Sequence, residues 1–272
     1  MLRSRIVMTG FALLLVFGCG SEQYESRLNE TNAFFEYRQS LDRVLQTGNW
    51  SVPLYGLTMR IPKGFNYKPG PPPPKGDEPA AEDTRQPTFL GLQLPGLMGA
   101  WQGDFPSDGG NRPVFLYVCS NHQTYLNAVK NPEGPDPALF LTDLENLLSS
   151  TMQVSLPPQD VVAQVGNNIR YDETCPRDGK YALQKKFTGI TFVPPGVLPQ
   201  LSDSGVEIKA QLYTHYNGPI QVAVLAIYPA GIRDRIEDKL LKSLETFSVS
   251  NQLPKVQGGS ATGPSGTSGK GF

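Results

Sequence analysis

Two segments of the sequence are apolar on both faces of an extended strand, and they restrict the fold more than any other feature. Nearly every residue is apolar in the segment 220–228, and the segment 113–120 contains an unbroken apolar run from Val114 to Val118. A strand of this kind is buried on both faces, as in the middle of a sheet that has a layer on each side. The sequence therefore predicts at least two central strands that are covered above and below.

A hairpin is predicted around the more apolar of these two segments. Asn217-Gly218-Pro219 is a turn sequence, and it joins the segment 205–216 to the segment 220–228. In the earlier arm, apolar residues at even positions alternate with Glu207, Lys209 and Gln211. We therefore expect this arm to have one buried face and one solvated face.

Three segments have the spacing of amphipathic helices. Apolar residues recur near helical spacing in the segment 29–46, which is predicted to pack on the domain or to act as a stalk. Asp136-Pro137 is a typical helix start, because the carboxylate caps the first free amides and proline suits the first turn. The helix predicted there ends near Ser150. In the segment 232–247, isoleucine or leucine recurs every four residues, which predicts the third helix.

The remaining chain is predicted to form short strands and long loops. The proline-rich segment 68–87 has no apolar face, so it is either a surface loop or, less often, a docking ligand for another protein. Central strands covered on both faces, together with three helices, predict the α+β class: a mainly antiparallel sheet with helices on both faces, an α/β/α sandwich. The other strands are predicted at 50–55, 57–61, 89–101 (two short strands), 160–165, 169–174 and 181–193.

The N-terminus has the pattern of a bacterial lipoprotein signal. Two arginines precede an apolar run at 6–17, which is shorter than the roughly 20 residues that span a bilayer. The sequence Val16-Phe17-Gly18-Cys19 resembles the lipobox that lipoprotein signal peptidases recognise, although Phe17 is bulkier than the usual residue. The resemblance implies that Cys19 carries a diacylglyceryl thioether and, after cleavage, an acylated amine. Two or three acyl chains, such as palmitate, hold a protein stably on a membrane.

Composition and charge indicate where the protein is located, how the chain is divided into parts, and that nucleic acid is not an expected partner. We expect an extracytoplasmic, membrane-anchored protein, on either the inner or the outer membrane. Removal of the signal leaves 22 basic and 25 acidic residues, a net charge of −3, so nothing favours nucleic acid. The predicted parts are a signal peptide at 1–18, a tether and helix at 19–48, the α+β domain at 49–250 and a Gly/Ser-rich disordered tail at 251–272.

A short stretch at the start of the domain resembles a known family. The stretch Tyr55–Phe65 is similar to the opening strand and "IP-x-G-F" turn of PsbP-like domains, and the closing hairpin and helix at 206–247 are similar to the end of that family. The long insertions at 68–87 and 194–203 depart from the compact pattern. The resemblance implies a mostly non-catalytic fold whose members bind partner proteins or act as assembly factors, and some are anchored lipoproteins.

Two cysteines remain once Cys19 is assigned to the lipid. Cys119 and Cys175 form an even pair, and in an oxidising extracytoplasmic compartment two such thiols are either joined in a disulfide or buried as small hydrophobes. Spacing alone does not decide between these alternatives, because a disulfide needs Cα atoms within about 7 Å.

No catalytic, cofactor or metal site emerges from the sequence. His122 and His215 are the only histidines, and His215 falls in register with the polar face of its strand, where a solvated side chain is expected. The spacing Cys119-x-x-His122 lacks the second Cys pair of a structural zinc site. The segment 104–109 begins like a calcium loop but has Pro106 at the third position, so a turn is expected.

These observations predict a membrane-anchored, non-enzymatic envelope lipoprotein that acts in protein–protein interaction or assembly. The alternatives are an anchored module that binds a small ligand in a pocket between sheet and helix, and an unrecognised hydrolase that uses His122 or His215.

Overall fold

The computed structural model describes residues 21–72, 81–108, 110–131, 133–159, 161–195 and 207–253, so Cys19 and the predicted signal lie outside the described residues. An eight-stranded antiparallel sheet with the order β3-β4-β5-β10-β9-β8-β7-β6 forms the centre of the protein. Its strands are β3 (Asn66–Lys68), β4 (Leu97–Ser107), β5 (Gly110–Ser120), β6 (Ala163–Val165), β7 (Asn168–Cys175), β8 (Lys185–Phe192), β9 (Ile208–Asn217) and β10 (Ile220–Pro229).

The two central strands predicted from the sequence are confirmed. β10 pairs with β5 on one side and with β9 on the other, and every one of its residues is buried. Successive residues of β10 contribute to two different hydrophobic clusters: Val222 and Val224 to one, Ala223 and Leu225 to the other. The sheet therefore separates two cores, one on each face.

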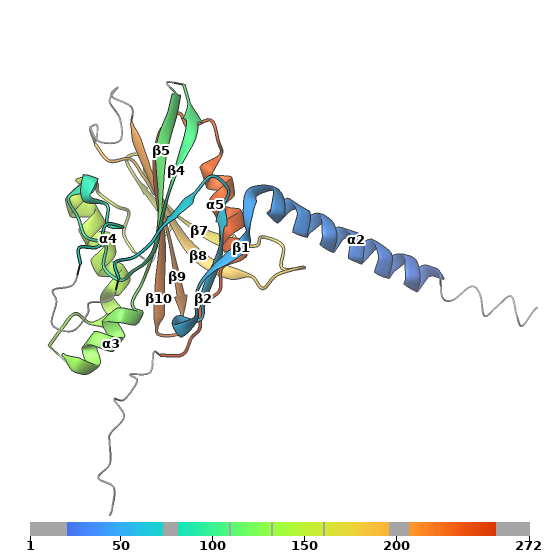
Figure 1. The fold of residues 1–272 in the computed structure, drawn as a ribbon, viewed down its shortest axis with the longest axis horizontal. Coiled ribbons are helices and arrows are strands. Elements are labelled where there is room, and N and C mark those ends of the chain that lie inside the picture. The colour runs from blue at the N-terminus through green and yellow to red at the C-terminus, as the bar shows by residue number, and fades with distance from the viewer. Residues whose placement is uncertain are drawn as a thin grey trace, which may run out of the picture.

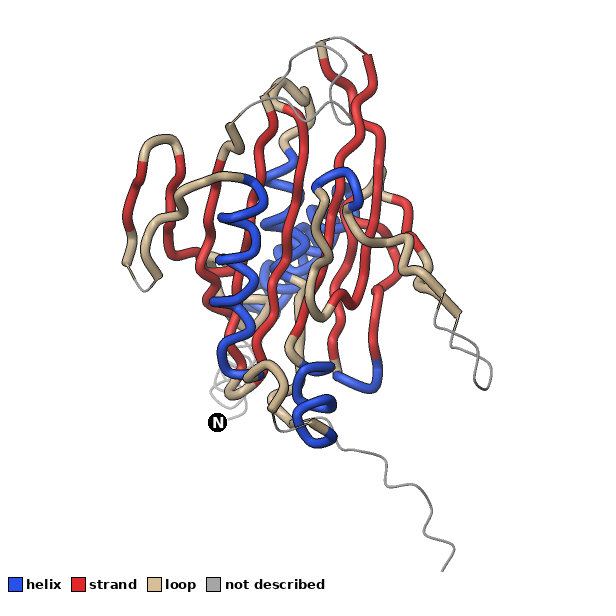
Figure 2. Tube along the Cα trace, turned by 90° about the vertical axis from the view of Figure 1, so that its left-hand side faces the viewer, coloured by secondary structure: helices blue, strands red, loops and turns tan. Residues whose placement is uncertain are grey.

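Each core is closed by its own layer, so the predicted α+β sandwich is confirmed (Figure 1). On one face lie α5 (Ile236–Glu245) and a two-stranded ribbon of β1 (Leu45–Val52) and β2 (Leu57–Pro62). On the other face lies α4 (Phe140–Met152), in front of the sheet in Figure 2. The other elements are α3 (His122–Lys130) and the short 3-10 helices η1 (Pro53–Tyr55), η2 (Thr88–Leu90) and η3 (Pro137–Leu139).

The predicted helix start at Asp136 is confirmed, and the start of the last helix is corrected. Asp136 Oδ1 accepts a hydrogen bond from the Ala138 amide at 2.9 Å, and the chain continues through η3 into α4. The last helix, α5, begins at Ile236 instead of Ile232. The residues before it are held in a bridge to the end of β4, where the Arg233 amide donates to the Pro106 carbonyl at 2.9 Å.

Two further predictions were wrong. The segment 89–101 does not form two short strands, because η2 and a loop precede a single long strand, β4, which continues through Asp104 to Ser107. That strand pairs with β5 along its whole length and buries Trp101 and Phe105, so the expected turn at 104–109 is instead mostly strand. α3 was not predicted, because its nine residues are too few for a repeated apolar spacing to stand out in the sequence.

The first described element, α2 (Ser21–Val44), is longer than predicted and projects from the body (Figure 1). Its C-terminal turns pack against α5, whereas most of its side chains before Tyr37 are exposed. Among the described residues, no helix has both the length and the apolar character needed to cross a membrane.

Candidate binding cleft at the base of α2

The base of α2 is fixed to the body by three side chains. Tyr37 stacks on Tyr181 with ring centroids 5.4 Å apart, and Leu41 is 4% exposed. Asp42 Oδ1 accepts a hydrogen bond from Arg60 Nη2 at 2.7 Å, and Arg60 Nε also donates to the Gln46 carbonyl at 2.9 Å. These contacts hold the direction in which the rest of the helix leaves the domain.

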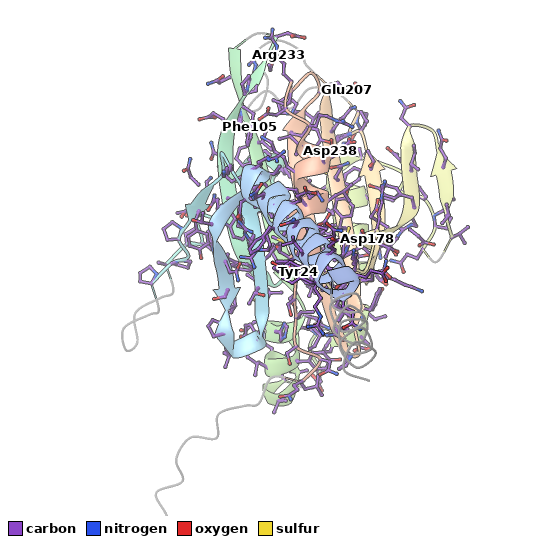
Figure 3. All side chains as sticks on the ribbon, turned by 90° about the vertical axis from the view of Figure 1, so that its right-hand side faces the viewer. Tyr24, Phe105, Asp178, Glu207, Arg233 and Asp238 are labelled. Atoms are coloured by element: carbon purple, nitrogen blue, oxygen red, sulfur yellow. The ribbon has the colours of Figure 1, made fainter. Side chains whose placement is uncertain are left out.

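A cleft of about 620 Å³ lies between this base, α5 and the end of β7. Figure 3 looks along α2 and shows Asp238, on α5, and Asp178, after β7, beside the helix. Most of the cleft wall is apolar and the charged groups lie around it. The lining residues are Tyr37 and Val44 from α2, residues 173–178 from β7 and the following segment, and Arg235, Asp238, Lys239, Leu241, Lys242 and Glu245 from α5 and its start.

The acidic and basic groups of the cleft differ in depth. The side chains of Glu173 and Glu245 are each 10% exposed, whereas their partners Arg177 and Lys242 are 79% and 35% exposed. Arg235, which pairs with Asp238 at 2.8 Å, is 83% exposed. Lys239, which also lines the cleft, is 23% exposed, and Asp238 is 51% exposed. The two least exposed of these charged side chains are therefore the carboxylates of Glu173 and Glu245.

Cys175 lines the cleft, and the pKa of its thiol reflects the nearby charges. Its side chain is buried, and burial, followed by the charges of Glu173 and Glu245, raises the pKa of the thiol to about 12. Arg177 and Lys185 act in the opposite direction but are outweighed. Because the thiolate is the reactive form of cysteine, Cys175 is a neutral, unreactive group at neutral pH.

Cys119 lies on the other face of the sheet, so it does not pair with Cys175. Both thiols are free and buried. Cys119 belongs to the core under α4, and Cys175 belongs to the core under α5. Burial raises the pKa of Cys119 to about 12 as well. Of the two alternatives left open by the sequence, the structure shows two buried thiols that act as small hydrophobes.

His122 is a buried structural residue. Its side chain is 0% exposed, its ring stacks on Tyr55 at 4.4 Å, and Nδ1 lies 2.6 Å from Ser120 Oγ. Ser120 Oγ also donates to the Gln221 carbonyl at 2.9 Å. Burial lowers the pKa of His122 to about 4, so the imidazole is neutral at pH 7. The serine beside it is fully buried, so the pair offers no surface at which a substrate can be attacked.

His215 is not on a solvated face, and the expectation of a polar face for β9 was wrong. Gln211 and Tyr213, on the same face of β9, are each 2% exposed. The ring of His215 lies 5.0 Å from that of Phe187, and its Nδ1 is 2.7 Å from the Lys186 carbonyl oxygen. The core under α5 extends over this face, and burial lowers the pKa of His215.

Metal ligands do not gather in the described parts of the chain. No group of three or more His, Cys, Asp or Glu side chains is placed there to hold a metal ion. Cys119 faces the core under α4, whereas His122 stacks on Tyr55 from the core under α5. These two residues therefore do not form the beginning of a zinc site.

Sequence reasoning did not find the cleft. Its walls come from three segments that are far apart in the chain, around Tyr37, Cys175 and Leu241. The only signal was the set of charged residues in α5 that lie off its apolar side, and such residues are also typical of any surface helix.

Comparison with known proteins does not assign the chain to a family. No family model matches the sequence, and no curated protein matches it.

Proposed function

We propose that the protein is a non-enzymatic lipoprotein of the cell envelope, anchored through Cys19 and facing the extracytoplasmic side, whose domain contacts a partner protein. The observation that carries the proposal is the geometry of α2. The described part of the helix runs from Ser21 to Val44, and its 24 residues span about 36 Å at about 1.5 Å per residue. A lipid at Cys19 would therefore hold the body at a distance from the membrane, joined to it by a helix.

The exposed part of α2 supplies a surface for a partner. Tyr24, Leu28 and Phe35 are 68%, 45% and 57% exposed, and their spacing, together with Thr31, places them on one side of the helix. An isolated helix that is otherwise polar gains little from such residues, whereas a second helix packed against them would bury their apolar area. We infer that this side of α2 contacts the partner.

Photo-crosslinking in intact cells tests this proposal. A photoreactive residue at Leu28 should capture one specific envelope protein, and the same residue at Val129 should not. Val129 is a matched control because it is apolar, 67% exposed and located on α3. If Leu28 yields no product above the Val129 background, the proposed contact is wrong.

A second candidate function is supported by the cleft. A volume of about 620 Å³ lies within the range of small-molecule pockets, roughly 300–1,000 Å³. An anchored ligand-binding module is therefore the alternative. The hydrolase hypothesis has no comparable support, because His122 is buried and His215 is packed between aromatic rings.

A further inference from the structure

Glu245, the last residue of α5, has an unsatisfied carboxylate oxygen at the edge of the cleft. Its Oε1 accepts a hydrogen bond from Lys242 Nζ at 2.7 Å. Its side chain is nine-tenths buried. Its Oε2 is buried too and has no hydrogen-bond partner of normal geometry among the described residues. A buried carboxylate oxygen without a donor is costly, so it marks a place where a donor from outside would be favourable.

The potential hydrogen-bond donor beside Oε2 is the Tyr37 hydroxyl. Burial, the charge of Glu245 and a hydrogen-bonding interaction with the Glu245 side chain raise the pKa of Tyr37 to about 12, so the hydroxyl lies beside this carboxylate. The hydroxyl nevertheless makes no hydrogen bond of normal geometry to Oε2. The face of the Tyr37 ring is also near a cation, because Lys242 Nζ lies 5.9 Å from its centroid. The corner between Tyr37 and Glu245 thus already holds one ammonium group.

The walls next to this corner are apolar. Val44, Pro176 and Leu241 line the cleft together with Lys242, whose aliphatic stem adds apolar surface. A ligand with an apolar body would bury surface against these residues. The second carboxylate, Glu173, is 10% exposed and lines the same cleft, so the two least exposed of its ion-paired groups are both acidic.

We propose that the cleft binds an organic ammonium ion carried on a short apolar chain, with its ammonium group donating to the carboxylate of Glu245. Lys242 is 35% exposed and flexible, so its Nζ can leave Oε1 for solvent and make room for the ligand. The ligand then supplies donors to both oxygens of Glu245, lies against the face of Tyr37 and covers the apolar walls. This site is separate from the exposed side of α2 and does not depend on the lipid at Cys19.

Titration calorimetry of the full-length chain in nonionic micelles tests the proposal, with n-hexylammonium as the probe. Hexanol and hexanoate have the same chain length without the positive charge. We expect hexylammonium to bind about tenfold more tightly than either, because a charge-assisted hydrogen bond is lost with them. Binding of hexanol or hexanoate as tight as that of hexylammonium, or no binding of any probe, would overturn the proposal.

Two variants locate the site, and they change affinity in opposite directions. Glu245→Gln should weaken hexylammonium binding about tenfold, and Lys242→Met should strengthen it about threefold because the competing internal ammonium is gone. A gain in affinity cannot arise from loss of the fold. Glu207→Gln and Lys186→Met are the controls, since both residues are exposed and neither lines the cleft. Partition into the micelle is common to all variants. Equal affinities of the parent, Glu245→Gln and Lys242→Met would contradict the assignment.

A third probe distinguishes the two sources of such a group. Nα-acetyl-lysine N-methylamide presents the side chain of a lysine in a polypeptide, whereas hexylammonium represents a free amine. Tight binding of the lysine derivative that is lost in Glu245→Gln would identify the ligand as a partner's lysine. Binding of hexylammonium alone would identify it as a small amine. Binding of either probe that is unaffected by Glu245→Gln would refute the site.

Discussion

Lowering the pH from 7 to 4 should destabilise the domain through His122, because this residue is buried as a neutral imidazole. Its pKa is lowered from an ordinary value of 6.5 to about 4 in the folded protein. Between these two values the unfolded chain binds more protons than the folded chain, so the free energy of unfolding falls as the pH falls. The full effect is present below pH 4 and absent above pH 7.

The magnitude follows from the size of the shift. At about 1.4 kcal/mol per pH unit, a difference of roughly 2.5 units corresponds to a loss of about 3 kcal/mol. Such a loss is a large part of the free energy of unfolding of a typical domain, which is roughly 5–15 kcal/mol. Urea unfolding of the parent and of His122→Gln at pH 7, 5.5 and 4 measures it.

The variant should start less stable at pH 7, because it loses the contact with Ser120 and the stacking on Tyr55, but its stability should fall less toward pH 4. His215→Gln is a second test of the same effect. The pKa of His215 is also lowered, so this residue contributes to the pH dependence in the same direction. The surface ion pairs contribute equally to all three proteins. Parallel pH profiles for the parent and His122→Gln would refute the conclusion that His122 is buried in its neutral form.

The remaining predictions concern buried groups. Arg170 donates to both carboxylate oxygens of Glu145, at 3.2 and 2.6 Å, and both side chains are less than 10% exposed. Arg170→Met should therefore lower the free energy of unfolding by roughly 3–5 kcal/mol in urea titrations, because it leaves a buried carboxylate without its partner. The double variant Arg170→Met/Glu145→Met should recover most of this loss. Equal stabilities of the single variant and the parent would contradict the pairing. Cys119 and Cys175 should not react with a thiol reagent in the folded protein and should react in urea. Absorbance measures the reaction in a variant without the N-terminal cysteine. Fast reaction of either thiol in the folded state would contradict its burial.

The central strands and the closing hairpin were predictable because their signals are local. An unbroken apolar run in β5 and β10 requires cover on both faces, and the turn between Asn217 and Ile220 fixes the register of the hairpin. The same reasoning failed for β9. Polar residues such as Gln211 alternate there as on a solvated face, but the core under α5 extends across that face.

The cleft and the fate of the two cysteines depend on long-range geometry that the sequence does not display. Cys119 and Cys175 were an even pair by number, yet one faces α4 and the other faces α5 across the sheet. Glu173 and Glu245 line one cleft only because β7 and α5 pack together. No spacing within either segment indicates that they share a cleft.

The most direct test of the account is the fate of labelled palmitate in cells that produce the parent or Cys19→Ser. We predict that the parent incorporates the label and sediments with membranes, and that Cys19→Ser incorporates none and stays in the soluble fraction. If the parent incorporates no label, and both proteins sediment with membranes to the same extent, the lipid at Cys19 does not anchor the protein and α2 is not its tether.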